Sequence, residues 1–112
     1  MTNENDNTRL KAREAQKIYS YIGLAMKSGS LVSGEFATEK SIQSKQAKLV
    51  IIALDASNNT KKKFKNKCTY YDVPLCFFGT KQELGKAIGK ELRSTVGVTN
   101  TGLANGIKKQ IR

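Results

Sequence analysis

The segment KLVIIAL, residues 48–54, is the most informative part of the sequence, because it is an unbroken apolar run between polar flanks. Apolar residues without alternation are typical of a strand covered on both faces, as in a parallel sheet between two layers of helices. The run therefore predicts a central strand. The residues that follow, DASNNT at 55–60, have side chains that suit the start of a helix.

The segments around this strand alternate between helical and strand patterns. Upstream, a helix is expected from Thr8 to Ser28, then a short strand at Leu31–Val32 and a helix from a Ser33 or Gly34 cap to near Ser44. Downstream, the pattern predicts a helix, a strand at 75–78, a helix closed by a glycine, a strand at 94–99 and a last helix; the two longer helices would bury Phe64, Cys68 and Tyr71, and Leu103, Ile107 and Ile111.

A helix followed by four strand-helix units predicts an α/β fold, a three-layer α/β/α sandwich. Residues 9–112 are expected to form one domain, and residues 1–8 a flexible N-terminal tail. The polar and acidic start MTNENDN differs from a signal peptide, and no apolar run approaches the roughly 20 residues of a membrane span. A cytoplasmic protein is therefore expected.

The charge points to a polyanion as partner. Lysine and arginine number 20 against 9 aspartates and glutamates, which gives a net charge of +11. Cationic side chains that neutralise phosphates release condensed counterions, so such a surface favours nucleic acid before any base is read. The alternative is a charge kept only for solubility, but solubilising surfaces usually mix the two signs.

The sequence is poorly supplied for catalysis. It has no histidine, no GxSxG motif and no visible pair of nucleophile and base, so no enzyme is expected. Cys68 and Cys76 are the only cysteines, and they can assemble neither a CxxC pair nor a His/Cys cluster. No metal site and no cofactor are expected. The two thiols are interpreted as reduced and packed like small hydrophobic side chains.

Two segments are candidates for binding. Lys61, Lys62, Lys63, Lys65 and Lys67 would form a positive ridge on the outward face of the third helix. No acid occurs between residues 56 and 71 to pair with them, which argues against a merely solvated face, although the ridge could also supply only long-range attraction. Ser33-Gly34-Glu35 offers open backbone N–H groups that suit a phosphate, or else a simple capped turn.

The aromatic residues are few, and Phe64, Phe77 and Phe78 fit the core. A platform on which single-stranded bases stack is therefore not expected. Structured RNA, recognised by its shape and by a few loops, fits the composition better.

Four strings in order resemble a known family. They are IGLAMKSGSLVSG at 22–34, AKLVIIALDAS at 47–57, YYDVPL at 70–75 and ELGKAIG at 83–89. Over residues 10–110 the chain is similar to the kink-turn RNA-binding ribosomal proteins of the L7Ae and L30e type, in particular to small bacterial ribosomal-like members. The resemblance implies an L30e-like sandwich with a four-stranded mixed sheet, no enzymatic activity and no cofactor.

The resemblance also implies where RNA would bind. Members of this family grip a kinked RNA stem with the turn after the first strand and the loop before the last strand, here residues 33–40 and 90–94. The RNA-binding residues implied here are Gly34, Glu35, Lys40, Leu92 and Arg93, with Asp55 orienting the neighbouring loop.

Phe36 and Ala37 depart from the family pattern, because they stand where polar residues read the guanines of tandem G·A pairs. A good pair of hydrogen bonds to a base edge contributes about 1–3 kcal/mol of discrimination. Losing both could abolish kink-turn specificity while leaving phosphate binding intact. Arg93 likewise replaces a proline and could contact a phosphate, while Leu92 could pack on an extruded base.

The sequence therefore predicts a non-catalytic, ribosomal-protein-like chain that binds structured RNA, either kink-turn-like or ribosomal. The alternative is a protein-protein adaptor or ribosome assembly factor on the same scaffold, and an exposed Phe36 would favour it. Other proteins, ribosomal ones included, are then further partners. Binding to a membrane surface is least favoured, since no basic amphipathic helix with large apolar anchors is visible.

Overall fold

Five helices alternate with four strands along residues 10–111, the part of the chain that the computed structural model describes. The elements in order are α2 (Ala12–Lys27), β1 (Leu31–Ser33), α3 (Glu35–Gln43), β2 (Leu49–Ile52), α4 (Asn58–Tyr71), β3 (Leu75–Phe77), α5 (Lys81–Ala87), β4 (Thr95–Val98) and α6 (Thr101–Ile111). The predicted order of elements is confirmed. The expected tail, residues 1–8, and the expected first residue of α2, Thr8, lie outside the described residues.

The four strands form one mixed sheet in the order β1-β4-β2-β3. β2 pairs in parallel with β3 and in antiparallel with β4, and β1 pairs in antiparallel with β4. The prediction that residues 48–54 form a central strand is confirmed. The expectation of a parallel strand is right for one neighbour only, because an apolar run reports that both faces are covered and does not report the direction of the partner strands.

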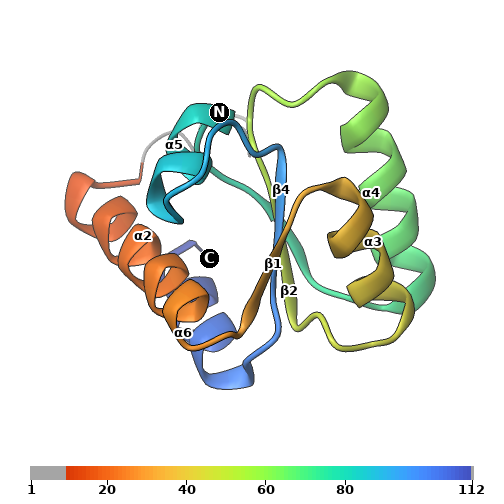
Figure 1. Cartoon of the computed structure of the whole chain (residues 1–112), viewed down its shortest axis with the longest axis horizontal. Helices are drawn as coiled ribbons and strands as arrows, with labels where there is room; N and C mark the ends of the chain where they lie inside the picture. The colour runs from red at the N-terminus through yellow and green to blue at the C-terminus, as the bar shows by residue number, and fades with distance from the viewer. Residues whose placement is uncertain (1–9, 112) are drawn as a thin grey trace.

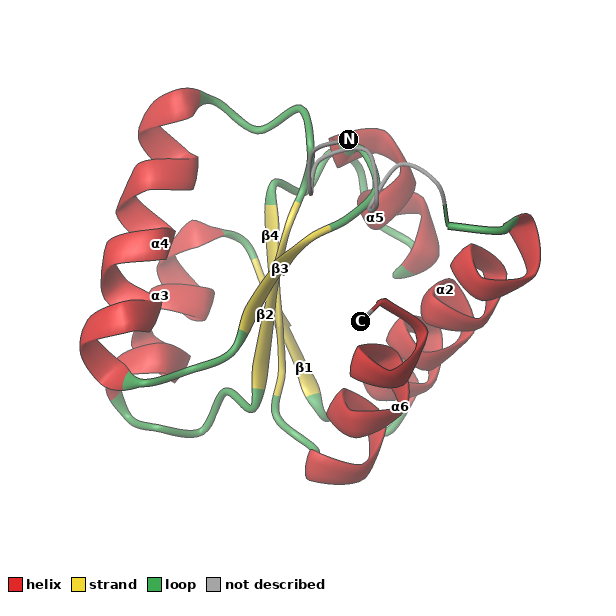
Figure 2. Cartoon of the chain, turned by 180° about the vertical axis from the view of Figure 1, so that it is seen from behind, coloured by secondary structure: helices red, strands yellow, loops and turns green. Residues whose placement is uncertain are grey.

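The helices cover both faces of the sheet, so the predicted α/β/α sandwich is confirmed (Figure 1). α3 and α4 lie on one face, and α2, α5 and α6 lie on the other (Figure 2). All four residues of β2 and of β4 are buried, as the two central strands require. The largest fully buried side chains include Phe64 of α4, Ile18 and Ile22 of α2, and Ile107 of α6.

Caps set the helix starts that the sequence predicted. The Ser57 hydroxyl accepts a hydrogen bond from the Thr60 N–H at the start of α4. Thr80 and Glu83 form a capping box at the start of α5. Gly89, with φ 72°, stands just past the end of α5 in the left-handed region that glycine adopts without strain.

Two aromatic residues that were expected to be buried, Phe77 and Tyr71, are only partly buried and pack against the core. Phe64 and Phe78 are buried, but Phe77 is only partly buried. Phe77 belongs to β3, the strand at the edge of the sheet, where the ring is covered by the core on one side only. The expectation that all three phenylalanines fill the core is therefore wrong for Phe77.

Gly85 lets α5 pack against the loop that precedes β4. A Cβ atom at Gly85 would lie 1.4 Å from the carbonyl oxygen of Glu91. The Gly85 carbonyl also accepts the N–H of Lys90 at 2.8 Å. No side chain can therefore occupy this position without moving the backbone of residues 90 and 91.

We expect Gly85→Ala to lower the free energy of unfolding by about 3 kcal/mol or more, because the new methyl group would overlap backbone that cannot rotate away. Chemical denaturation followed by circular dichroism measures this change. Gly23→Ala in α2 is the matched control, since its Cβ would meet the Ala87 carbonyl oxygen at an ordinary 3.7 Å. The control gains helix propensity, about 0.5–1 kcal/mol. Equal stability of the two variants would contradict the proposed packing.

Candidate nucleic-acid interface

The sheet topology brings several loops to one end of the molecule. β1, β2 and β3 run in one direction and β4 runs in the opposite direction. The segments that follow β1, β2 and β3 therefore meet the segment that precedes β4. Figure 1 shows β1 running into α3 at the same end of the sheet at which β4 begins.

The turn from β1 into α3 depends on Gly34. Its φ of 89° and ψ of 159° fall in a region that is almost restricted to glycine. The Gly34 N–H donates to the Thr95 carbonyl at 3.0 Å, and the Gly34 carbonyl accepts the Thr38 N–H at 3.0 Å. The turn is thus fixed to β4 on one side and to α3 on the other.

The loop before β4 lies directly beside this turn. Arg93 Nε donates to Ser33 Oγ at 3.3 Å, and Arg93 Nη1 donates to the Leu92 carbonyl at 2.9 Å. Residues 33–40 and 90–94 therefore form one continuous surface, which we call the rim. The two segments that the sequence singled out for RNA binding lie side by side.

Asp55 is linked to the rim through two hydrogen bonds of Lys81. Its Oδ1 accepts the backbone N–H of Lys81 at 2.8 Å, and the Lys81 carbonyl accepts the N–H of Arg93 at 3.0 Å. Asp55 therefore holds the start of α5 and, through it, the loop that carries Arg93. The role of Asp55 in orienting this loop for RNA stays a prediction.

Glu35 points toward α4. Glu35 Oε2 accepts the Thr60 hydroxyl at 2.8 Å, and Glu35 Oε1 lies 3.9 Å from Lys63 Nζ. The Thr60 hydroxyl accepts in turn from Ser57 Oγ at 3.0 Å. Glu35 thus links the rim to the first turn of α4, and its direct contact with RNA stays a prediction.

Phe36 and Leu92 are the exposed apolar side chains of the rim, with relative exposures of 75% and 59%. Lys40 Nζ lies 5.2 Å from the centre of the Phe36 ring, one helical turn away on α3. The rim therefore combines apolar groups with the cations of Lys40 and Arg93. Ala37, the second departure from the family pattern, is half-buried.

Two side-chain contributions at or beside the rim were not predicted from the sequence, although Ser33 itself lies in a predicted segment. Ser33 accepts the Arg93 guanidinium, and nothing in its local pattern could have indicated a partner 60 residues away. Lys86 lines a hollow beside the rim together with Lys90 and Leu92. α5 ends at Ala87, so Lys90 lies in the following loop, and helical spacing in the sequence could not have placed it beside Lys86.

The lysines of α4 lie at its surface, but two of them are paired with an acid, which the sequence did not predict. Lys63 and Lys67 reach Glu39 of α3 at 3.1 and 3.0 Å. Hydrogen bonds from Lys67 and Lys63 hold the pKa of the Glu39 carboxyl below its usual range. The acids absent from α4 itself are supplied by the neighbouring helix, which sequence spacing within α4 could not reveal.

Both thiols are protonated near neutral pH. Burial raises the pKa of Cys68 to about 11 and that of Cys76 to about 12, so neither is a reactive thiolate. Both cysteines are free, as expected. Residues 10–111 hold no group of three or more His, Cys, Asp or Glu side chains placed to bind a metal ion. No helix within the same residues is long and apolar enough to cross a membrane.

Residues 16–107 match the profile of the ribosomal protein L7Ae/L30e/S12e/Gadd45 family. The chain is 43% identical over 96 residues to the RNA-binding protein YlxQ of Enterococcus faecium, in an alignment that covers 86% of this chain and 92% of that protein. It is 45% identical over 87 residues to RNA-binding protein YlxQ of Bacillus subtilis, covering 78% of this chain and 87% of that protein. The large ribosomal subunit protein eL30 of Neurospora crassa is 36% identical over 95 residues, covering 80% of this chain and 84% of that protein.

A solved structure of a protein from Bacillus halodurans superposes with a TM-score of 0.81 at 39% identity, covering 85% of this chain and 96% of that protein. The names of the relatives in sequence are those of RNA-binding and ribosomal proteins, not of enzymes. This agrees with the absence of catalytic motifs from the sequence.

We expect Glu39→Gln to lower the free energy of unfolding at pH 7 by about 1 kcal/mol, the upper end for partly exposed ion pairs. A carboxyl with a lowered pKa stabilises the fold above the pKa of the unfolded chain, about 4.3. The difference in free energy of unfolding between the variant and the wild type should therefore shrink as the pH is lowered below about 4.3. Urea titrations at pH 7 and pH 3 measure this.

Glu91→Gln is the control for this experiment, because Glu91 is exposed and forms no ion pair within residues 10–111. A Glu39→Gln effect that persists undiminished at pH 3 would show that the ion pairs to α4 are not its source.

Proposed function

Because the chain belongs to the ribosomal protein L7Ae/L30e/S12e/Gadd45 family, we propose that it is a non-catalytic protein that binds structured RNA through the rim. The observation that carries this proposal is the contact of Arg93 with Ser33, which joins the two predicted RNA-binding segments into one surface. Lys40 and Arg93 would contact phosphates on it. The exposed Leu92 would pack on a base that has left the stack.

The rim is suited to recognition by shape and backbone. Gly34 has no side chain, and nothing lies within 4 Å of the place where a Cβ would stand, so a phosphate can approach the turn closely. Phe36 and Ala37 offer no side-chain hydrogen bonds to base edges. A kinked stem, with its two backbones drawn together and a base extruded, matches these features better than a straight duplex does.

The proposal extends to location and domain organisation. A ribosomal or other structured RNA as partner implies a cytoplasmic protein, and the similarity to eL30 supports this. Residues 9–112 would act as one RNA-binding domain.

We expect the double variant Lys40→Gln and Arg93→Gln to bind a kinked stem more weakly, by roughly eightfold at 0.1 M salt for each phosphate that is no longer neutralised. The slope of log K against log salt should also fall by about 0.9 per phosphate. Filter binding at several salt concentrations measures both quantities.

The control removes the same charge from elsewhere: Lys108→Gln and Lys109→Gln lie at the exposed end of α6. If the control loses as much affinity as the rim variant, the effect is general attraction and the rim is not the site. Equal affinity of the wild type for a kinked stem and a straight duplex would remove the specificity for a kink.

Leu92→Ser tests the apolar contact of the rim. The side chain is 59% exposed, so the substitution should leave the unfolding transition in place. We expect an affinity for the kinked stem about fivefold lower, which corresponds to about 1 kcal/mol for a partly buried apolar side chain. Affinity for a straight duplex, which extrudes no base, should not change, and an equal loss for both RNAs would exclude the role proposed for Leu92.

A protein-protein adaptor is the second candidate function, and the exposure of Phe36 beside Lys40 favours it. An exposed aromatic ring among polar groups is typical of a protein hot spot. Phe36→Gln discriminates the two functions. If the protein is an adaptor, the Phe36→Gln variant will keep its affinity for RNA and lose its binding to the protein partner.

A further inference from the structure

The lysines of α4 fall into two groups. Lys63 and Lys67 are held by Glu39 of α3, at 3.1 and 3.0 Å. Lys61, Lys62 and Lys65 make no ion pair within residues 10–111. The helix itself carries no acid, so three cations on its outer side are left without a counter-charge from the described part of the fold.

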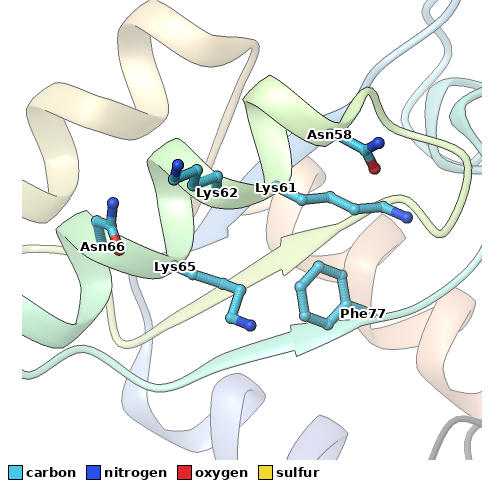
Figure 3. Close-up of a pocket in the computed structure, with 6 residues that line it drawn as sticks. All are labelled: Asn58, Lys61, Lys62, Lys65, Asn66 and Phe77. Carbon is cyan, nitrogen blue, oxygen red and sulfur yellow. The ribbon is translucent and has the colours of Figure 1, made fainter.

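The cations of the second group surround a hollow between α4 and the edge of the sheet. It has a volume of about 410 Å³, and its lining residues are Asn58, Lys61, Lys62, Lys65, Asn66 and Phe77. Lys61 and Lys65 extend from α4 toward the ring of Phe77 and flank it (Figure 3). The incomplete burial of Phe77, which its position in the core pattern did not predict, leaves this ring open to the hollow.

A second hollow of about 610 Å³ lies farther along the same helix and shares Asn66 with the first. Its lining includes Tyr70, which is 80% exposed and meets the Tyr71 ring edge-on at 4.8 Å between centroids. The outer side of α4 and the neighbouring strand β3 thus present three groups in turn. They are the Phe77 ring between lysines, the Asn66 amide and the exposed Tyr70 ring. We call this surface, residues 58, 61, 62, 65, 66, 70 and 77, the α4 face.

The chemistry of the α4 face selects an extended ligand. A compact anion would need several donors converging on one point, whereas these cations are distributed along a helix that is about 20 Å long. An acidic protein segment would match the charge, but it does not regularly place a flat group between its carboxylates to stack on each of the two rings. Single-stranded RNA presents phosphates and flat bases in alternation, and each base can stack on an aromatic ring.

The geometry points to the α4 face as a second RNA site: we propose that it binds a single-stranded segment that continues from the structured RNA on the rim. This inference rests on the proposed function of the rim. The rim meets the first turn of α4, where the Thr60 hydroxyl donates to Glu35 at 2.8 Å, and the neighbouring residues of that turn, Asn58 and Lys61, belong to the α4 face. An RNA strand leaving the Gly34 turn would reach Asn58 and Lys61 next.

The experiment compares a kinked stem with the same stem extended by about eight unpaired uridines, a length within the usual range of single-strand sites. The wild type should bind the extended RNA about tenfold more tightly at 0.1 M salt. Lys61→Gln with Lys65→Gln should reduce this gain to less than about threefold, because two cations that neutralise phosphates are removed. Tyr70→Ser, at a largely exposed position, should reduce it by about fivefold because a stacking ring is removed.

Lys108→Gln with Lys109→Gln is again the charge-matched control, and it should keep the gain. Loss of the gain in the α4 variants alone supports the site. Three outcomes overturn it: the wild type binds both RNAs equally, the α6 control loses as much as the α4 variant, or the α4 variant keeps the gain and instead loses binding of an oligoglutamate peptide. A wild type that binds neither RNA would overturn the proposed function as well.

Discussion

The rim exists because β1 and β4 pair in antiparallel. The register places Ser33 opposite Val96, so the last residue of one strand faces the beginning of the other. The Gly34 N–H then reaches the Thr95 carbonyl, and the Arg93 side chain reaches Ser33. Two segments separated by about 60 residues of chain become one surface because these backbones share a ladder.

Much of the fold follows from local patterns in the sequence. The run at 48–54, the cap at Ser57 and the glycine at 89 each act within a few residues of themselves, so their consequences can be predicted without knowing the rest of the chain. The direction of the strand partners could not be predicted in the same way. Pairing depends on crossovers of many residues, and the resemblance to a known family supplied the mixed sheet that residue patterns left open.

In the candidate site, too, some features could be predicted from the sequence and others depend on tertiary packing. The positions of Gly34, Lys40 and Arg93 were available from the resemblance to a known family. The contacts of Glu35 with Thr60 and of Glu39 with Lys63 and Lys67 were not, because they join α3 to α4 across the surface of the sheet. In sequence alone, the helix carries five equivalent cations. Tertiary packing is what makes two of them structural and leaves three for a ligand.

Arg93 combines a structural contact with capacity for a ligand. A guanidinium has five N–H donors in a rigid fork, and here one at Nε and one at Nη1 are used to hold Ser33 and the Leu92 carbonyl. Three donors therefore remain on a side chain that is already ordered. A phosphate can bind it without the entropy cost of immobilising a flexible side chain. A lysine at this position would supply the charge, but its compact ammonium has only three donors and no planar fork with which to hold the two protein oxygens in fixed directions. The residue that closes the rim is thus also the one best prepared to contact what binds there.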